Sequence, residues 1–429
     1  MPLQPHSTLP RIRASVLTAG VLIALFFAAA APLIHSGYSK GRAAYDQRAF
    51  YGATVLQFLA QWPRPGLGDY PAATTPGYYL AIAAAAQVAG TGLRTLQFLG
   101  SLFTAGLLIT LAVALCRRAN ALMALALCLP VLCSPYVFPG GVWMLPDGAG
   151  WWGVLCVMLV ALKPRVDART YISGGLALLA LVMVRQTHLW TAAPLCAAAW
   201  LGSGENAGAP FRVAAPRGRR LALMACAIIP SILAIAWFVR LWHGMVPPNQ
   251  QSLVAGGNWA APAMALATAG MLGVFYAPIV LPRLRGLRWM SPALAGTAAG
   301  AIIGAIPITT YSMRAGRFSG IWNIVRHMPY IANRSPPLIA LAAFGGLAVA
   351  LWLLVLPLRQ RWIWAVAVAA FLVAQIPAHY AFQRYYEPFV LIAAAVSLSR
   401  LPGKTPRWPL AGPIVLAVLL AGVTWMSLR

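Results

Sequence analysis

Long apolar stretches follow one another along nearly the whole chain, separated by short polar and basic segments. Many of them approach the roughly 20 residues that an α-helix needs to cross the hydrocarbon core of a bilayer. The pattern predicts an all-α polytopic membrane protein that forms one integral membrane domain over residues 1–429. The thirteen predicted spans are residues 14–34, 96–115, 121–138, 149–162, 170–184, 188–202, 221–241, 262–282, 289–310, 337–357, 362–379, 385–399 and 409–427.

A further apolar stretch, residues 77–90, is short and follows a proline. Whether it crosses the membrane decides on which side every later loop lies. If it lies in the interface, the loops on one side of the membrane collect 19 of the 32 Lys and Arg residues. Cytoplasmic loops are enriched in these residues. We therefore expect the N-terminus inside, the C-terminus outside and an interfacial amphipathic helix in the first outer loop, residues 35–95. The other predicted outer loops are residues 139–148, 185–188, 242–261, the large late loop 311–336, and 380–386.

Composition narrows the class of protein. Hydrophobic residues make up 61% of the chain and charged residues 9%, whereas soluble domains carry roughly 25% charged residues. This excludes a soluble enzyme. A net charge of +26 would suggest nucleic acid as the partner of a soluble protein. Here the cations lie in loops between apolar runs, so we predict the lipid bilayer as the partner and no nucleic acid.

The chain holds six carboxylates, and four of them, Asp46, Asp69, Asp147 and Glu387, fall on the predicted outer side. No carboxylate lies at the middle of a predicted span, which argues against a proton-coupled pump. The opening section of the first outer loop directly follows the first span. This places Asp46 near the lipid headgroups and makes it the candidate catalytic base. The alternative is an interfacial Asp paired with Arg42 or Arg48.

Asp147 lies in a tight outer loop that contains no cation, and it is the second candidate acid, with a role in orienting the acceptor. The alternative is a turn-forming Asp-Gly pair. The sequence contains no metal-ligand spacing and no nucleotide-binding motif, so we predict no cofactor. A metal is not required, although Asp46 and Asp147 could share one if the fold brings them together.

Cations on the outer side run against the usual topological bias, so each needs a reason. Arginine presents a planar fork that suits phosphate oxygens, and at a membrane surface the expected phosphate is carried by a lipid. The candidates for binding it are Arg185, Arg326, His327, Arg334 and Arg384. For any single Arg the alternative is snorkelling to the headgroups, and Arg384 could instead pair with Glu387, three residues later.

Several motifs on the outer side resemble those of the GT-C superfamily of membrane glycosyltransferases. Within it the chain is most similar to the dolichyl-phosphate-glucose-dependent alpha-1,2-glucosyltransferase family. The matching pieces keep that family's order between about residues 40 and 400, and they are YDQRAF, TTPGYYL, LPDGAGWW, VRQTHLW, PPNQQSLVAGGNW, HMPYIANRS and FQRYYEPFV. The chain departs from the family where an Asp-Glu pair is replaced by Asp46-Gln47 and where ANRSPP lacks the family's flanking acid and His.

The resemblance implies a GT-C fold and an inverting transfer of a hexose, glucose in that family, from a polyprenyl-phosphate-linked donor to a glycan or lipid-linked acceptor. It implies that Asp46 is the catalytic base. It also implies a cavity lined by Thr74, Thr75, Tyr78, Tyr79, Gln186, His188, Asn333, Tyr385 and Glu387.

Two alternatives remain open from the sequence. One is an outer-leaflet oligosaccharide ligase or polymerase that uses the Arg and His residues of the late loop. The other is a transporter or flippase for lipid-linked glycans. The Ala- and Arg-rich composition suggests a bacterial inner membrane, with the active site facing the periplasm.

Overall fold

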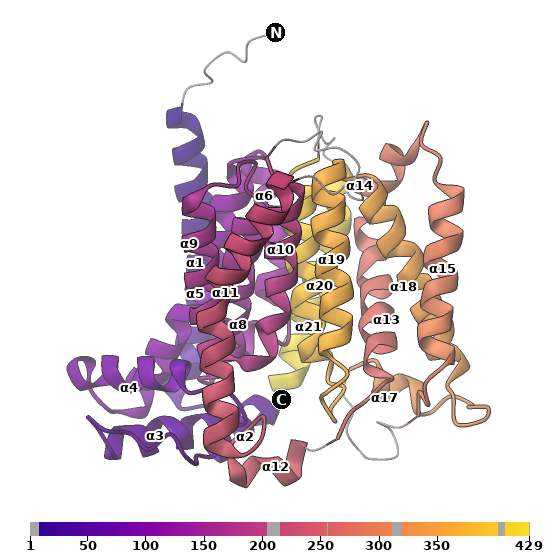
Figure 1. Ribbon diagram of the computed structural model, residues 1–429. Coiled ribbons are helices and arrows are strands. Elements are labelled where there is room, and N and C mark those ends of the chain that lie inside the picture. The colour runs from indigo at the N-terminus through magenta and orange to yellow at the C-terminus, as the bar shows by residue number, and fades with distance from the viewer. Residues whose placement is uncertain (1–7, 204–214, 255, 311–319, 402–407, 429) are drawn as a thin grey trace.

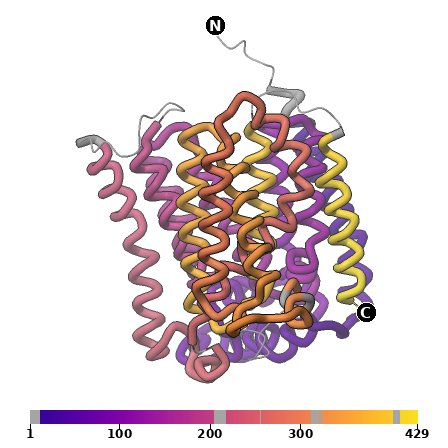
Figure 2. Tube along the Cα trace, turned by 90° about the vertical axis from the view of Figure 1, so that its right-hand side faces the viewer, coloured from indigo at the N-terminus to yellow at the C-terminus, as the bar shows by residue number. Residues whose placement is uncertain are grey.

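The computed structural model describes residues 8–203, 215–254, 256–310, 320–401 and 408–428. Within these ranges every regular element is a helix, and one isolated β-bridge joins Ile331 and Arg334. The helices stand side by side in one bundle (Figures 1 and 2). The first helix begins at one end of this bundle and the last helix finishes near the other. The predicted all-α architecture is confirmed.

Six segments of the described chain are long and apolar enough to cross a bilayer, with mean hydropathies from 1.9 to 2.4. Each overlaps a predicted span, because an apolar run of this length satisfies its backbone polar groups internally only as a helix. The helices concerned are α1 (Thr8–Ser36), α5 (Leu93–Cys116), α11 (Ala215–Trp242), α13 (Ala261–Gly273) with its continuation through η3 (Val274–Tyr276), α14 (Ala277–Val280) and η4 (Leu281–Leu284), α18 (Pro336–Leu354) and α21 (Ala411–Leu428).

Shorter helices stand at the other predicted spans, and in Figure 1 they run along the long ones. They are α6 (Ala121–Cys133), α8 (Asp147–Ala161), α9 (Ala168–Val184), η2 (Gln186–Thr191) with α10 (Ala192–Leu201), α15 (Met290–Ala305), α19 (Leu358–Ala374) and α20 (Glu387–Leu398). A brief η6 (Trp408–Leu410) precedes α21. The structure thus has a helix at every predicted position. The lengths and compositions of these helices support a helical protein with several membrane-spanning helices.

The first outer loop folds into short helices that cover one end of the bundle. They are α2 (Gly41–Asp46), the π-helix η1 (Gln47–Tyr51), α3 (Gly52–Ala60) and α4 (Gly77–Ala89). Figure 1 shows α3 and α4 lying across the ends of the long helices instead of along them. The amphipathic helix expected at residues 77–90 therefore corresponds to α4. Further short elements occupy connections of the chain, namely α7 (Phe138–Val142), α12 (Pro248–Val254), α17 (Trp322–Val325) and η5 (Gln383–Tyr385).

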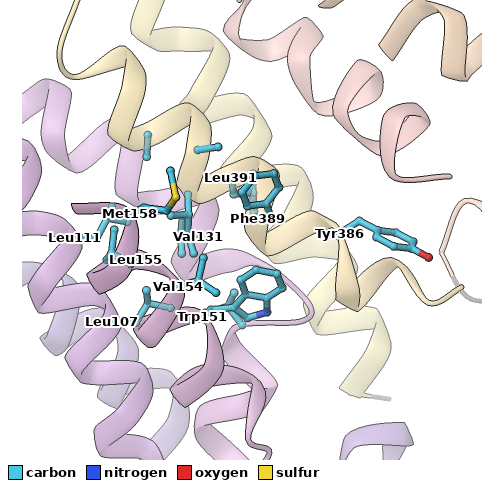
Figure 3. Close-up of a cluster of buried hydrophobic side chains, with 14 of the residues drawn as sticks. Leu107, Leu111, Val131, Trp151, Val154, Leu155, Met158, Tyr386, Phe389 and Leu391 are labelled. Carbon is cyan, nitrogen blue, oxygen red and sulfur yellow. The ribbon is translucent and has the colours of Figure 1, made fainter. Parts of the chain in front are cut away.

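The centre of the bundle is a continuous hydrophobic core, part of which Figure 3 shows. Leu111 of α5, Val131 of α6, Leu155 of α8 and Leu391 of α20 are each completely buried in it. Trp151 of α8 lies at the edge of this cluster. The core therefore fixes α8 and α20, whose first residues Asp147 and Glu387 are carboxylates at helix ends.

Two adjacent glycines let α18 pack in backbone contact with its neighbours. A Cβ atom on Gly345 would lie 1.9 Å from the Leu266 carbonyl oxygen of α13, and one on Gly346 would lie 2.1 Å from the Gly296 carbonyl oxygen of α15. Both distances are far inside van der Waals contact. Small residues at such positions allow the close approach that drives helix association in a membrane.

Replacing Gly346 with Leu is expected to destabilise the fold, because the new side chain has to push α15 away from α18. Overpacking of this kind costs about 1–3 kcal/mol. Gly422→Leu in α21 is the matched control, since no atom lies within 4 Å of a Cβ at that position. Thermal unfolding in detergent measures the difference. Equal unfolding midpoints for the two variants would contradict the backbone contact at Gly346.

Candidate active site

A cavity of about 270 Å³ collects residues from many of these elements at the end covered by the first outer loop. Its wall combines α2 and η1, the loop before α4, the second turn of α8, η2, α12, the end of α19 and η5. Of the predicted site residues, the lining includes Asp46, Thr74, Arg185, Gln186, His188, Arg384 and Tyr385. Residues from several predicted outer loops and helix ends thus meet in one place.

Asp46, the last residue of α2, is 2% exposed. Its carboxylate makes two ion pairs: Nη1 of Arg384 lies 2.7 Å from Oδ2, and Nε of Arg42 lies 3.1 Å from Oδ1. The Arg42 side chain is 74% exposed, so its pair is screened by solvent and contributes little. The Arg384 side chain is 19% exposed, so its attraction to Asp46 is much less screened. Arg48, the other neighbour considered in the sequence, instead donates to the Ser39 carbonyl.

Asp147 forms the second ion pair of the site. It is the first residue of α8, where the helix dipole favours a negative charge. Nη1 of Arg185 lies 2.7 Å from its Oδ1, and both side chains are less than a tenth exposed. Arg185 directly follows α9 and has an extended backbone, with φ of −157° and ψ of 107°. Asp147 is therefore a partner of a buried arginine and not merely a turn residue.

Tyr385 lies between the two arginines. The guanidinium carbons of Arg185 and Arg384 lie 5.1 and 5.2 Å from the centre of its ring, within the range of cation–π attraction. Nη2 of Arg384 also donates to its hydroxyl at 3.3 Å. Burial lowers the pKa of Arg384, but Tyr385, Tyr51, Asp147 and Asp46 together hold it well above its ordinary value. The cavity therefore carries two fixed positive charges beside two carboxylates.

The loop before α4 is held to η2 by buried hydrogen bonds. Gln186 Oε1 accepts from the Thr75 backbone at 3.0 Å, and Gln186 Nε2 donates to the carbonyls of Ala73 and Met245. Thr75 Oγ1 donates to the Val182 carbonyl at 2.6 Å. Gln186 thus lines the cavity, but its amide atoms are hydrogen-bonded to the backbone of neighbouring segments.

Three residues predicted to line the cavity lie behind its wall: Thr75, Tyr78 and Tyr79. The Tyr79 hydroxyl is hydrogen-bonded to Thr74 Oγ1 at 2.7 Å, and the Tyr78 hydroxyl lies against Gly100 of α5. All three are fully buried. The sequence motif TTPGYYL therefore mainly builds the support of the site.

Glu387 is also outside the cavity lining, and its suggested pairing with Arg384 is wrong. Its completely buried carboxylate accepts from Ser134 Oγ at 2.7 Å and from Gln383 Nε2 at 2.8 Å. Gln383 Oε1 in turn accepts from the Ile321 backbone at 2.9 Å. This chain of hydrogen bonds joins the end of α6, the start of α20 and the late outer loop behind η5, the turn that carries Arg384 and Tyr385.

The predicted phosphate-binding and cavity-lining residues of the late loop lie elsewhere. Arg334 donates to the carbonyls of Ala305 and Ile306, so it closes the C-terminal end of α15, where backbone carbonyls lack helical partners. The Asn333 carbonyl accepts from Thr310. Arg326 donates to His327 Nε2 at 3.1 Å on an exposed surface. None of these four residues lines the cavity, and residues 311–319 of the same loop lie outside the described chain.

The sequence alone did not single out Tyr51 and Trp151, which line the cavity as well. Helical spacing was the available signal, because Trp151 lies four residues after Asp147 on α8 and therefore on the same face. Burial raises the pKa of the Tyr51 phenol well above its ordinary value, while the nearby Arg384 opposes this. Tyr51 is therefore a neutral hydroxyl among the charges.

Across the described ranges, no group of three or more His, Cys, Asp or Glu side chains comes together in a way that could hold an ion. Asp46 and Asp147 each bind an arginine instead.

Replacing Arg185 with Met is expected to destabilise the protein by about 3–5 kcal/mol, because it leaves the buried Asp147 carboxylate without its counter-charge. Adding Asp147→Asn to that variant should recover much of the loss, since no buried charge then remains unpaired. Arg42→Met is the control, because an exposed pair contributes up to about 1 kcal/mol. Unfolding midpoints of the single and double variants test the coupling. Strictly additive losses would show that the pair does not act as a unit.

No family model, curated protein or solved structure matches this chain. What the protein does must therefore be inferred from the chemistry of this cavity.

Proposed function

We propose that this protein is an integral membrane glycosyltransferase of the GT-C type that moves a hexose from a polyprenyl-phosphate carrier to a glycan or lipid-linked acceptor. One observation carries the proposal: a buried carboxylate, Asp46, a buried arginine, Arg185, and a partly buried one, Arg384, face the same cavity. This is the pairing of a proton acceptor with a phosphate clamp that such a transfer needs. It is found at the bundle end covered by α3 and α4, where a lipid headgroup would lie (Figure 1).

The two arginines suit a phosphate that bridges a lipid and a sugar. Both guanidinium groups lie close to the Tyr385 ring, and both side chains line the same cavity. Charge-assisted hydrogen bonds to phosphate are among the stronger polar interactions of proteins, and arginine can make two at once. In the reaction, these groups stabilise the negative charge that builds up on the departing phosphate.

Asp46 acts as the base in this proposal. An entering phosphate competes with Asp46 for the Arg384 guanidinium. When the guanidinium turns to the phosphate, the Asp46 carboxylate loses its counter-charge and becomes a better proton acceptor. The acceptor hydroxyl then transfers its proton to Asp46 while its oxygen bonds to the anomeric carbon. The bond between that carbon and the phosphate oxygen breaks, and the polyprenyl phosphate leaves with the electron pair. Attack from the side opposite the phosphate inverts the anomeric configuration.

The proposed membrane arrangement has about thirteen crossings, with the cavity on the outer side of a bacterial inner membrane, facing the periplasm. Helices at all thirteen predicted positions support it. An odd number of crossings requires the first and last helices to begin and finish on opposite sides of the membrane. In the structure, α1 begins at one end of the bundle and α21 finishes near the other (Figures 1 and 2). The bias of Lys and Arg toward the opposite loops supports the orientation.

Asp46→Asn is expected to lower the transfer rate by about 10²–10⁴-fold, the usual contribution of a general base, while binding of the donor lipid persists because both arginines remain. The assay is turnover of a radiolabelled polyprenyl-phosphate hexose by purified protein in liposomes. Asp69→Asn is the matched control from the same outer loop. Asp69 lies outside the cavity and accepts from the Asn249 backbone, so its variant should keep activity.

Other outcomes of this assay identify the alternatives. An Asp46→Asn variant with nearly full activity would rule out the base and favour a ligase or polymerase. Movement of labelled glycolipid between leaflets without any transfer would instead identify a transporter or flippase.

A further inference from the structure

Beside the two arginines, polar atoms of the cavity lining and of the adjoining Asp147 have no hydrogen-bond partners. They are Nδ1 and Nε2 of His188, Nε1 of Trp151 and Oδ2 of Asp147, and none of them has a partner among the described residues. The three side chains are 5%, 1% and 2% exposed, respectively. A buried donor or acceptor without a partner is costly. Several such atoms at one place indicate a ligand whose polar groups form hydrogen bonds with them.

The three side chains belong to one wall of the site. Trp151 follows Asp147 by four residues of α8, and its ring meets the His188 ring edge-on with their centres 5.0 Å apart. Gly150, between them in α8, makes room for the imidazole, because a Cβ there would lie 3.1 Å from His188 Nε2. Trp151 and His188 both line the cavity with Arg185. In Figure 3, Trp151 lies at the edge of the buried cluster with its indole nitrogen on the outer side of the ring.

The chemistry of these atoms differs from that of the arginines. A neutral imidazole offers one donor and one acceptor, the indole offers a donor, and the free carboxylate oxygen offers an acceptor. Such a mixed set matches hydroxyl groups, which both donate and accept. It does not match a phosphate, which only accepts and which the Asp147 carboxylate would repel.

We propose that Trp151, His188 and Asp147 form the subsite for the transferred sugar and that this sugar is a neutral hexose. The inference rests on the proposed function, because Arg185 and Arg384 hold the phosphate to which the hexose is attached. Arg185 joins the two parts of the site, since it binds Asp147 Oδ1 and leaves Oδ2 for a sugar hydroxyl. A uronic acid would bring a second negative charge near Asp147, and we expect like-charge repulsion to weaken its binding.

Binding of three lipids to the full-length protein in detergent tests this assignment: polyprenyl-phosphate glucose, polyprenyl-phosphate glucuronate and unglycosylated polyprenyl phosphate. The wild type should bind the glucose lipid roughly tenfold more tightly than the unglycosylated one, which corresponds to one or two hydrogen bonds. It should bind the glucuronate lipid more weakly than the glucose lipid. Equal binding of the glucose and glucuronate lipids would overturn the neutral-sugar assignment.

His188→Phe keeps a ring against Trp151 but removes both nitrogens, so it should abolish the preference for the glucose lipid and leave binding of unglycosylated polyprenyl phosphate unchanged. Trp151→Phe, which removes one donor, should reduce the preference. Asp69→Asn, which lies outside the cavity, is the control. Unfolding midpoints close to the wild-type value establish that the variants are folded.

The outcomes separate the two proposals. If His188→Phe and Trp151→Phe both keep the full preference for the glucose lipid, the proposed sugar subsite is wrong, but the proposed transferase function is not contradicted. If the wild type binds none of the three lipids, the proposed function fails and the subsite fails with it.

Discussion

The site depends on two carboxylate–arginine pairs whose guanidinium groups lie 5.1 and 5.2 Å from the centre of the Tyr385 ring. Asp46 binds Arg384, and Asp147 binds Arg185. A charge buried in a membrane-protein interior is tolerated only with its partner in place. Each pair therefore joins two segments that are far apart in the sequence, the first outer loop to η5 and the start of α8 to the end of α9. Loss of either pair would release a wall of the cavity.

Behind this charged layer, neutral hydrogen bonds hold the same segments. Gln186 fixes the loop before α4 onto η2, and Glu387 with Gln383 fixes η5 to α6 and to the late outer loop. These groups were candidates for binding a ligand, yet they are already satisfied within the protein. Polar residues at helix ends thus fall into two classes, those that hold the loops and those that remain open toward the cavity.

The sequence predicted the helices well because hydropathy is a local property. An apolar run has to form a helix in a bilayer whatever lies elsewhere in the chain, so the predicted spans coincide with helices, and the short stretch at residues 77–90 is the transverse helix α4. The sequence also singled out Asp46, Arg185 and Arg384, which the structure brings to one cavity. The partner of a charge was less predictable, because Arg384 lies 338 residues from Asp46. For the same reason Arg334, which closes α15, could not be told apart from an arginine of the site.

The balance of charge in the cavity limits what can bind there. Its lining and the adjoining Asp147 contribute three arginine side chains, Arg42, Arg185 and Arg384, against two carboxylates, Asp46 and Asp147. The empty site therefore carries a small excess of positive charge. Each carboxylate already neutralises one guanidinium. A second acidic ligand group would find no further cation, whereas one phosphate joined to a neutral sugar brings the charge close to balance. The same carboxylates that keep the arginines stable in the empty cavity thus restrict it, on the proposed function, to a donor with a single anionic group.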